Sequence, residues 1–140
     1  MRWLTVSLLA LLLVPATHAT SLQARLIRAT NDSAEADKRL QDIEKDLKKK
    51  FGYEHYLLIG NQPAALEAKA QQRLDLGEGF VVFVTPKSID KNVHEMDLEW
   101  YSGRLSLVKT TVRIPARSSL FVKGPDVGKD WIVLALTIAE

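Results

Sequence analysis

His94 and Met96 form the first pair in the sequence whose chemistry suits a metal. They are two positions apart, so in a β-strand both side chains point to the same face. Imidazole and thioether groups are ligands that suit copper(I). However, Met96 continues an apolar row with Leu98 and Trp100, and a metal site needs more ligands than this pair supplies. We therefore expect Met96 in the core, His94 at its margin, and no bound metal.

The sequence lacks the local motifs of nucleophilic catalysis and nucleotide binding. It contains no Cys and no G-x-S-x-G, and it has no P-loop or dinucleotide fingerprint. Paired carboxylates of the glycosidase type depend on geometry rather than on a motif. Glu95, Asp97 and Glu99 nevertheless alternate with apolar residues, which indicates the polar face of one strand. We expect no catalytic residues and no cofactor, and a small hydrolase is the least favoured function.

Aromatic and cationic side chains come together at one predicted turn. The segment Trp100-Tyr101-Ser102-Gly103-Arg104 would place them at a hairpin tip, and Trp, Tyr and Arg are enriched in binding hot spots. The competing interpretation is that Trp100 points inward and Tyr101 only braces the turn. Trp100, Tyr101 and Arg104 are the candidate binding residues.

The overall charge is nearly balanced. Without Arg2, 18 Lys and Arg residues stand against 17 Asp and Glu residues. Long-range attraction to nucleic acid or to an anionic membrane needs a much larger excess of positive charge. We therefore expect no nucleic-acid partner.

Residues 1–19 have the layout of a secretory signal peptide. Arg2 precedes the apolar stretch Trp3–Ala16, and Thr17-His18-Ala19 forms a small-x-small cleavage site. We expect cleavage before Thr20 and no membrane-spanning segment in the mature chain, because a span needs about twenty apolar residues. An uncleaved anchor is the alternative. The absence of Cys excludes a lipidated cysteine and disulfides, and it favours a bacterial periplasmic or secreted protein.

One segment, residues 34–50, has helical periodicity. Its apolar residues recur at steps of three and four, in a stripe that comprises Ala36, Leu40, Ile43, Leu47 and Phe51. Asp32 or Ser33 is the expected N-cap, and Gly52 is the expected stop. The pattern predicts one amphipathic helix near the N-terminus, packed on a sheet.

The rest of the chain predicts strands joined by short turns. The expected strands are residues 21–29, 53–59, 64–76, 80–85, 93–100, 105–114, 119–123 and 131–139. Segment 64–76 has a helical composition, but its strict alternation favours a strand. Segment 131–139 is nearly all apolar, which is typical of a strand covered on both faces.

These elements predict an α+β fold in which residues 20–140 form one domain. Short connections imply antiparallel neighbours, so about seven to eight strands would make a sandwich or a curled sheet with one helix on it. We expect an exported, non-enzymatic interaction or accessory domain of an envelope assembly, with another envelope protein as its partner. The alternative is a small-ligand carrier with a pocket between helix and sheet.

Overall fold

The computed structural model describes residues 20–139, and the predicted signal peptide, residues 1–19, lies outside them. The strands are β1 (Ser21–Thr30), β2 (His55–Ala65), β3 (Gln72–Gly77), β4 (Phe80–Asp90), β5 (Val93–Ser102), β6 (Leu105–Pro115), β7 (Ser119–Val127) and β8 (Asp130–Ala139). The helical elements are the 3-10 helix η1 (Lys38–Leu40) and the α-helix α1 (Glu44–Phe51). Within the described part of the chain, no helix is long and apolar enough to cross a membrane.

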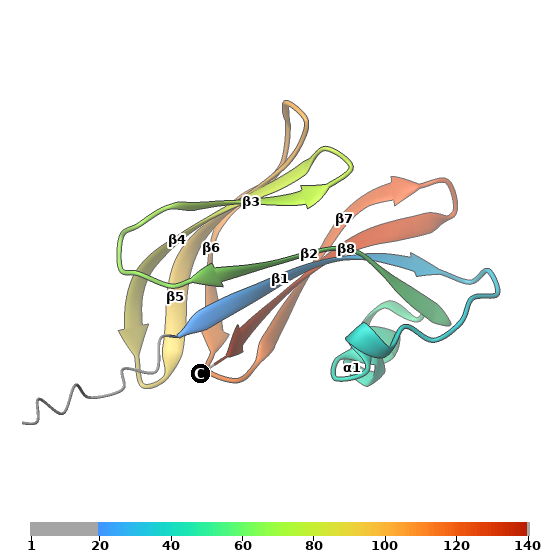
Figure 1. The fold of residues 1–140 in the computed structure, drawn as a ribbon, viewed down its shortest axis with the longest axis horizontal. Helices are drawn as coiled ribbons and strands as arrows, with labels where there is room; N and C mark the ends of the chain where they lie inside the picture. The colour runs from blue at the N-terminus through green and yellow to red at the C-terminus, as the bar shows by residue number, and fades with distance from the viewer. Residues whose placement is uncertain (1–19, 140) are drawn as a thin grey trace, which may run out of the picture.

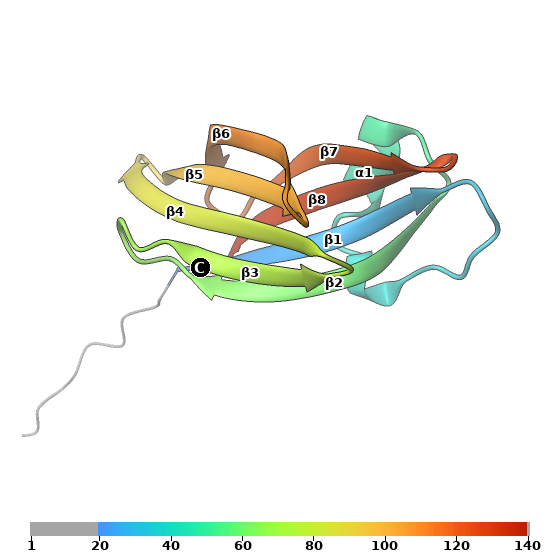
Figure 2. The same ribbon diagram turned by 90° about the horizontal axis from the view of Figure 1, so that it is seen from above.

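The eight strands form two four-stranded antiparallel sheets. Sheet A has the order β2-β1-β8-β7, and sheet B has the order β3-β4-β5-β6. The sheets lie face to face, with β3 against β2 and β6 against β7 at the two edges (Figures 1 and 2). The mostly antiparallel α+β class with one helix is therefore confirmed, and of the two predicted arrangements the strands form the sandwich.

The core between the sheets follows the period-two alternation of the strands. β1 and β8 contribute one row of apolar side chains each, and β4 and β5 contribute the facing rows; these include Leu22, Leu26, Leu134, Leu136, Val82, Val84, Leu98 and Trp100. Successive side chains of a strand point to opposite faces. In β5 and in the first half of β4, every second residue is therefore buried, and its neighbours lie on the outer face.

Sheet A is covered on both faces. The side of β1 and β8 that faces away from sheet B carries Ile27, Ala29, Val133 and Ala135, and these pack against Leu47 and the other apolar residues of the helical segment. The predicted double coverage of residues 131–139 is confirmed. Double coverage also explains why Ile27 interrupts the simple alternation of β1, because the outer face of this strand is apolar as well.

The helix predicted near the N-terminus, over residues 34–50, is not supported at that position, because the α-helix α1 spans only Glu44–Phe51. η1 and α1 are separate, and residues 34–37 are not helical. In a continuous α-helix the Arg39 carbonyl would accept from the Ile43 N–H. Instead the Ile43 N–H donates to Leu40, and the Arg39 carbonyl accepts from the buried Arg25 side chain at 3.1 Å. That tertiary contact breaks the helix between its two parts.

Asp37, rather than Asp32 or Ser33, caps the helical segment. Its carboxylate accepts from the Arg39 N–H at 3.1 Å and from the Leu58 N–H, on the edge strand β2, at 3.0 Å. The cap therefore fastens η1 to the sheet. At the other end of the segment the Tyr56 hydroxyl donates to the Leu47 carbonyl at 2.9 Å. Gly52 ends α1 with φ +76°, as predicted.

The predicted strand 64–76 is two strands in different sheets. β2 continues through Pro63 to Ala65, the chain crosses from sheet A to sheet B, and β3 begins at Gln72. Lys69 has φ +63° in the crossover, which is a turn conformation. Pro63 is compatible with β2 because this strand lies at a sheet edge. Near it, a Cβ at Gly60 would meet the Leu76 carbonyl oxygen at 1.9 Å, so the two sheets approach closely here.

Replacing Leu47 with Ala tests whether the helical stripe belongs to the core. Leu47 is fully buried against sheet A, so we expect the free energy of unfolding to fall by about 2–5 kcal/mol. Denaturant melts would measure this change. Lys49→Ala on the exposed side of α1 is the control, and a loss below about 0.5 kcal/mol for Leu47→Ala would contradict the packing.

Asp37 makes stability depend on pH. The hydrogen bond from the Arg39 side chain, with those from the Leu58 and Arg39 N–H groups, outweighs partial burial and lowers the pKa of Asp37 from 3.8 to about 2. The carboxylate therefore contributes stability above pH 3.8, and the contribution is lost as the pH falls towards 2. We expect Asp37→Asn to destabilise the protein by about 1–2 kcal/mol near neutral pH. The difference from the wild type should close in urea melts near pH 2; a gap that is constant with pH would be contrary to this role.

Candidate functional site

The two groups of predicted site residues lie at opposite ends of strand β5, with Arg104 in the turn that follows it. His94, Met96, Leu98 and Trp100 form its buried row, and Met96, Leu98 and Trp100 are completely enclosed. The predicted inward row is confirmed. His94 and Met96 lie beside the β4–β5 turn, whereas Trp100 and Tyr101 approach the β5–β6 turn. Any surface site that this row helps to form must therefore lie at one of its two ends.

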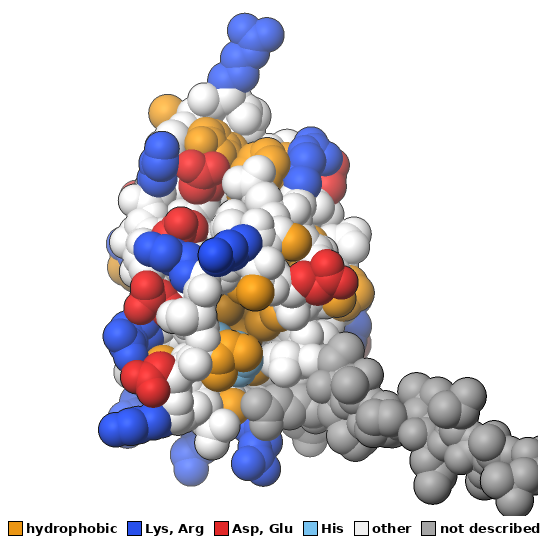
Figure 3. All heavy atoms as spheres, turned by 90° about the vertical axis from the view of Figure 1, so that its left-hand side faces the viewer, with side chains coloured by type: hydrophobic (Ala, Val, Ile, Leu, Met, Phe, Trp, Pro, Cys, Tyr) orange, Lys and Arg blue, Asp and Glu red, His pale blue; other side chains and the backbone are white. Residues whose placement is uncertain are grey.

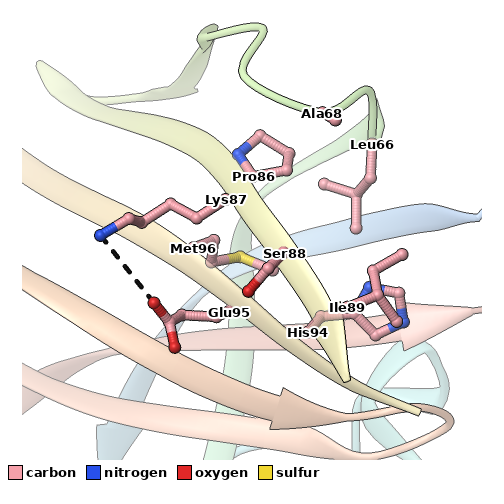
Figure 4. A pocket seen from close by; sticks show the side chains of 9 residues that line it. All are labelled: Leu66, Ala68, Pro86, Lys87, Ser88, Ile89, His94, Glu95 and Met96. Atoms are coloured by element: carbon pink, nitrogen blue, oxygen red, sulfur yellow. Dashed lines mark ion pairs between the residues drawn. The ribbon is translucent and has the colours of Figure 1, made fainter. Parts of the chain in front are cut away.

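An apolar hollow of about 200 Å³ lies at the His94 end of β5. We call it the end hollow; it is lined by Leu66, Ala68, Pro86, Lys87, Ser88, Ile89, His94, Glu95 and Met96. Figure 4 shows these side chains, which come from β4, β5 and the crossover segment 66–70; Leu66, Ile89 and His94 lie on one side of β4, and Lys87, Ser88 and Glu95 on the other. Seen from the corresponding end, the molecule has hydrophobic side chains in a depression with charged side chains around it (Figure 3).

Backbone contacts hold the walls of the end hollow in place. The Lys69 N–H donates to the Pro86 carbonyl at 2.8 Å, and the Leu66 N–H donates to the Thr20 carbonyl at 3.0 Å. The pairing of β4 with β5 shifts register between Pro86 and Ser88. Such a bulge bends a strand and redirects its side chains, so that Pro86, Lys87, Ser88 and Ile89 all contribute to the lining.

The charges at the rim of the end hollow are paired with one another. Lys87 Nζ lies 3.8 Å from a Glu95 carboxylate oxygen, the pair marked in Figure 4, and 3.9 Å from Asp97. Arg113 lies 3.5 Å from the second oxygen of Glu95. Because both signs are present and in contact, the rim offers no net charge to a ligand.

His94 and Met96 both line this hollow, as copper(I) ligands would have to. A metal site needs further ligands. In residues 20–139 no three His, Asp or Glu side chains are grouped so that they could hold an ion. We therefore do not propose a metal site at this pair.

The three carboxylates of β5 lie on the outer face of sheet B and have partners there. Glu95 pairs with Arg113, and Glu99 lies 3.5 Å from Lys109. The Thr111 hydroxyl donates to Asp97 at 2.7 Å. This arrangement is a cross-strand ladder of opposite charges, which stabilises a sheet, and nothing in it singles out one carboxylate as a general acid.

The β5–β6 hairpin tip carries Tyr101 and Arg104. Tyr101 is half-buried and packs edge-to-face on Phe83, with ring centroids 5.8 Å apart. Arg104 is exposed, and Leu105 beside it is 65% exposed. The Gly103 N–H donates to the Gly79 carbonyl of the neighbouring β3–β4 turn at 2.9 Å. The tip, which projects in Figure 1, is therefore supported by a second hairpin.

Trp100 does not belong to this surface. It is 0% exposed, its ring contacts Phe80 at a centroid distance of 6.1 Å, and Gly124 of β7 lies directly over it. Our inclusion of Trp100 among the binding candidates was therefore wrong for a contact residue, and the inward interpretation holds. Phe83 and Leu105 were not identified from the sequence, although a large apolar residue directly after a turn was a signal for Leu105.

Another cluster of aromatic residues lies where α1 meets β7 and β8. Tyr53 contacts Trp131 at a centroid distance of 5.2 Å, and Phe51 contacts Phe121 at 6.4 Å. Lys123 Nζ lies 3.1 Å from the centroid of the Trp131 ring. This cation–π contact occupies the ring face that a ligand would use, so the cluster is a weaker candidate than the two ends of β5.

The helix–sheet interface does not contain the end hollow. Leu40, Ile43 and Leu47 fill that interface, whereas the hollow lies at the end of the sandwich. No protein-family model matches the chain, and no curated protein or solved structure is significantly similar to it. The function is therefore inferred from this geometry.

Gly124→Ala tests the structural role of Trp100. A Cβ at position 124 would lie 2.3 Å from the indole ring, so the ring or strand β7 must shift. We expect a loss of about 1–3 kcal/mol, as for other overpacked cores, measured in urea melts. Val127→Ala, on an exposed part of the same strand, is the matched control and should change stability by less than about 0.5 kcal/mol. Equal stability of Gly124→Ala and wild type would contradict the tight packing.

Proposed function

We propose that this chain is an exported, non-enzymatic interaction domain that contacts another envelope protein through the tip of its β5–β6 hairpin. The contact region, called the hairpin surface, consists of Phe83, Tyr101, Arg104 and Leu105. The observation that carries the proposal is the exposure of Leu105, 65% of whose surface is in water beside an exposed Arg104. Covering such a side chain on binding is favourable.

The chemistry of the hairpin surface favours a protein partner. Tyr101 is held against Phe83, so little side-chain entropy remains to be lost when it is covered. The Arg104 guanidinium offers several directional hydrogen bonds to carboxylates or backbone carbonyls. Tyrosine and arginine are also among the residues enriched in binding hot spots.

The difference between the two sheets supports the same proposal. Sheet A is covered by the helical segment, whereas the outer face of sheet B has no covering element within residues 20–139. A partner that meets the hairpin tip can extend onto this face without displacing any part of the described chain. The expected signal peptide and the absence of Cys favour an envelope location.

The test is the double variant Tyr101→Ala with Arg104→Ala. Both residues lie outside the core, so the melting temperature should stay nearly unchanged while capture of the partner in a pull-down from the native envelope weakens by about tenfold or more. Arg117→Ala, at an exposed arginine in the turn between β6 and β7, is the control. Full capture by the folded double variant would refute the hairpin surface. Unfolding of the variant would instead show that Tyr101 braces the turn.

A further inference from the structure

We propose that the end hollow is a binding site for a small, neutral, largely apolar molecule of about the size of one aromatic ring. The site lies at the opposite end of β5 from the hairpin surface. It therefore does not depend on the proposed protein contact, and the two can be tested separately.

The lining determines the chemical class of the ligand. Leu66, Pro86, Ile89 and Met96 supply most of the wall, and Met96 at its base is fully buried. Water in an apolar hollow makes few hydrogen bonds, so an apolar molecule displaces it favourably. Ser88 and His94 are polar residues of the lining, and a ligand with a single hydroxyl or N–H group therefore fits as well as a hydrocarbon.

The size of the end hollow limits the ligand to one ring or a short branched chain. Its volume is about 200 Å³. An apolar cavity of about 150 Å³ is known to hold benzene, whereas drug-sized ligands occupy pockets of about 300–1,000 Å³. A benzyl, phenol or indole group is of the appropriate size.

The rim selects a neutral ligand. Lys87 and Arg113 each already form an ion pair with Glu95. A charged ligand would lose its hydration in the hollow and would have to compete for these partners, which is costly. A neutral ligand leaves the ion pairs as they are.

Ile89 provides an independent reason to expect a ligand at the mouth. It lines the end hollow, yet 65% of its surface is exposed, which is unusual among the large apolar residues of the described chain. A molecule in the hollow covers part of this side chain, and the burial of apolar area contributes to binding.

The processed protein offers a single reporter inside the site. The sequence contains two methionines, and removal of the signal peptide leaves only Met96. With ¹³C-methyl methionine labelling, the exported protein should give one methyl signal. We expect benzyl alcohol and indole to shift this signal saturably. The charged analogues benzoate and benzylamine should bind at least about tenfold more weakly than benzyl alcohol.

Ala68→Phe adds a large side chain to the lining of the end hollow and should abolish the saturable shift. Ser106→Phe introduces the same side chain at an exposed position of β6, and it should leave the shift unchanged. Ile89→Ala removes part of the wall at an exposed position, so it should fold and should weaken binding severalfold even if Ala68→Phe does not fold.

Three results would overturn the proposal. The first is the absence of any saturable shift of the Met96 methyl signal with benzyl alcohol and indole. The second is equal binding of benzyl alcohol, benzoate and benzylamine. The third is unchanged binding in Ile89→Ala. None of these results bears on the hairpin surface, because the titration involves no protein partner.

Discussion

The covered sheet depends on one buried cation. Arg25 is 6% exposed and lies on β1, in the interior of sheet A. Its guanidinium donates to both oxygens of Asp42, at 2.8 and 3.0 Å, and to the Thr137 hydroxyl and the Arg39 carbonyl. A buried charge without partners is very costly, so the helical segment must stay where Asp42 and Arg39 can meet Arg25. The same contact lowers the pKa of Asp42. Because these contacts hold the helical segment in place, it covers the outer face of β1 and β8.

The asymmetry between the two sheets explains where sites can form. The helical segment covers β1 and β8 of sheet A, and the outer face of β5 carries paired charges, so the inner row of β5 reaches the surface only at its ends. The indole of Trp100 fills one end because Gly124 leaves room for it. At the other end the row finishes with the smaller side chains of Met96 and His94, and a hollow of about 200 Å³ remains. The position of the hollow therefore follows from residue sizes along one strand.

The sequence predicted what depends on local periodicity and missed what depends on contacts between distant segments. The alternation of β5, the buried stripe of α1 and the double coverage of β8 were all visible as patterns. The break in the helix was not visible as a pattern. It depends on a hydrogen bond from the Arg25 side chain to the Arg39 carbonyl, and these two residues are 14 positions apart in the chain. The crossover within residues 64–76 was hidden for a similar reason, since alternation continues on both sides of it. Likewise, Leu66 and Ile89 meet Met96 only in the folded chain.

The two candidate surfaces are far enough apart to act at the same time. Met96 and Tyr101 are five positions apart on β5, which corresponds to about 17 Å along an extended strand. A protein that contacts only the hairpin tip therefore leaves the mouth of the end hollow open. Any influence of one site on the other must pass through the inner row of β5, where Leu98 and Trp100 are fully enclosed. Close packing resists gradual deformation, so a ligand small enough to enter the end hollow without moving Met96 leaves the hairpin tip in place.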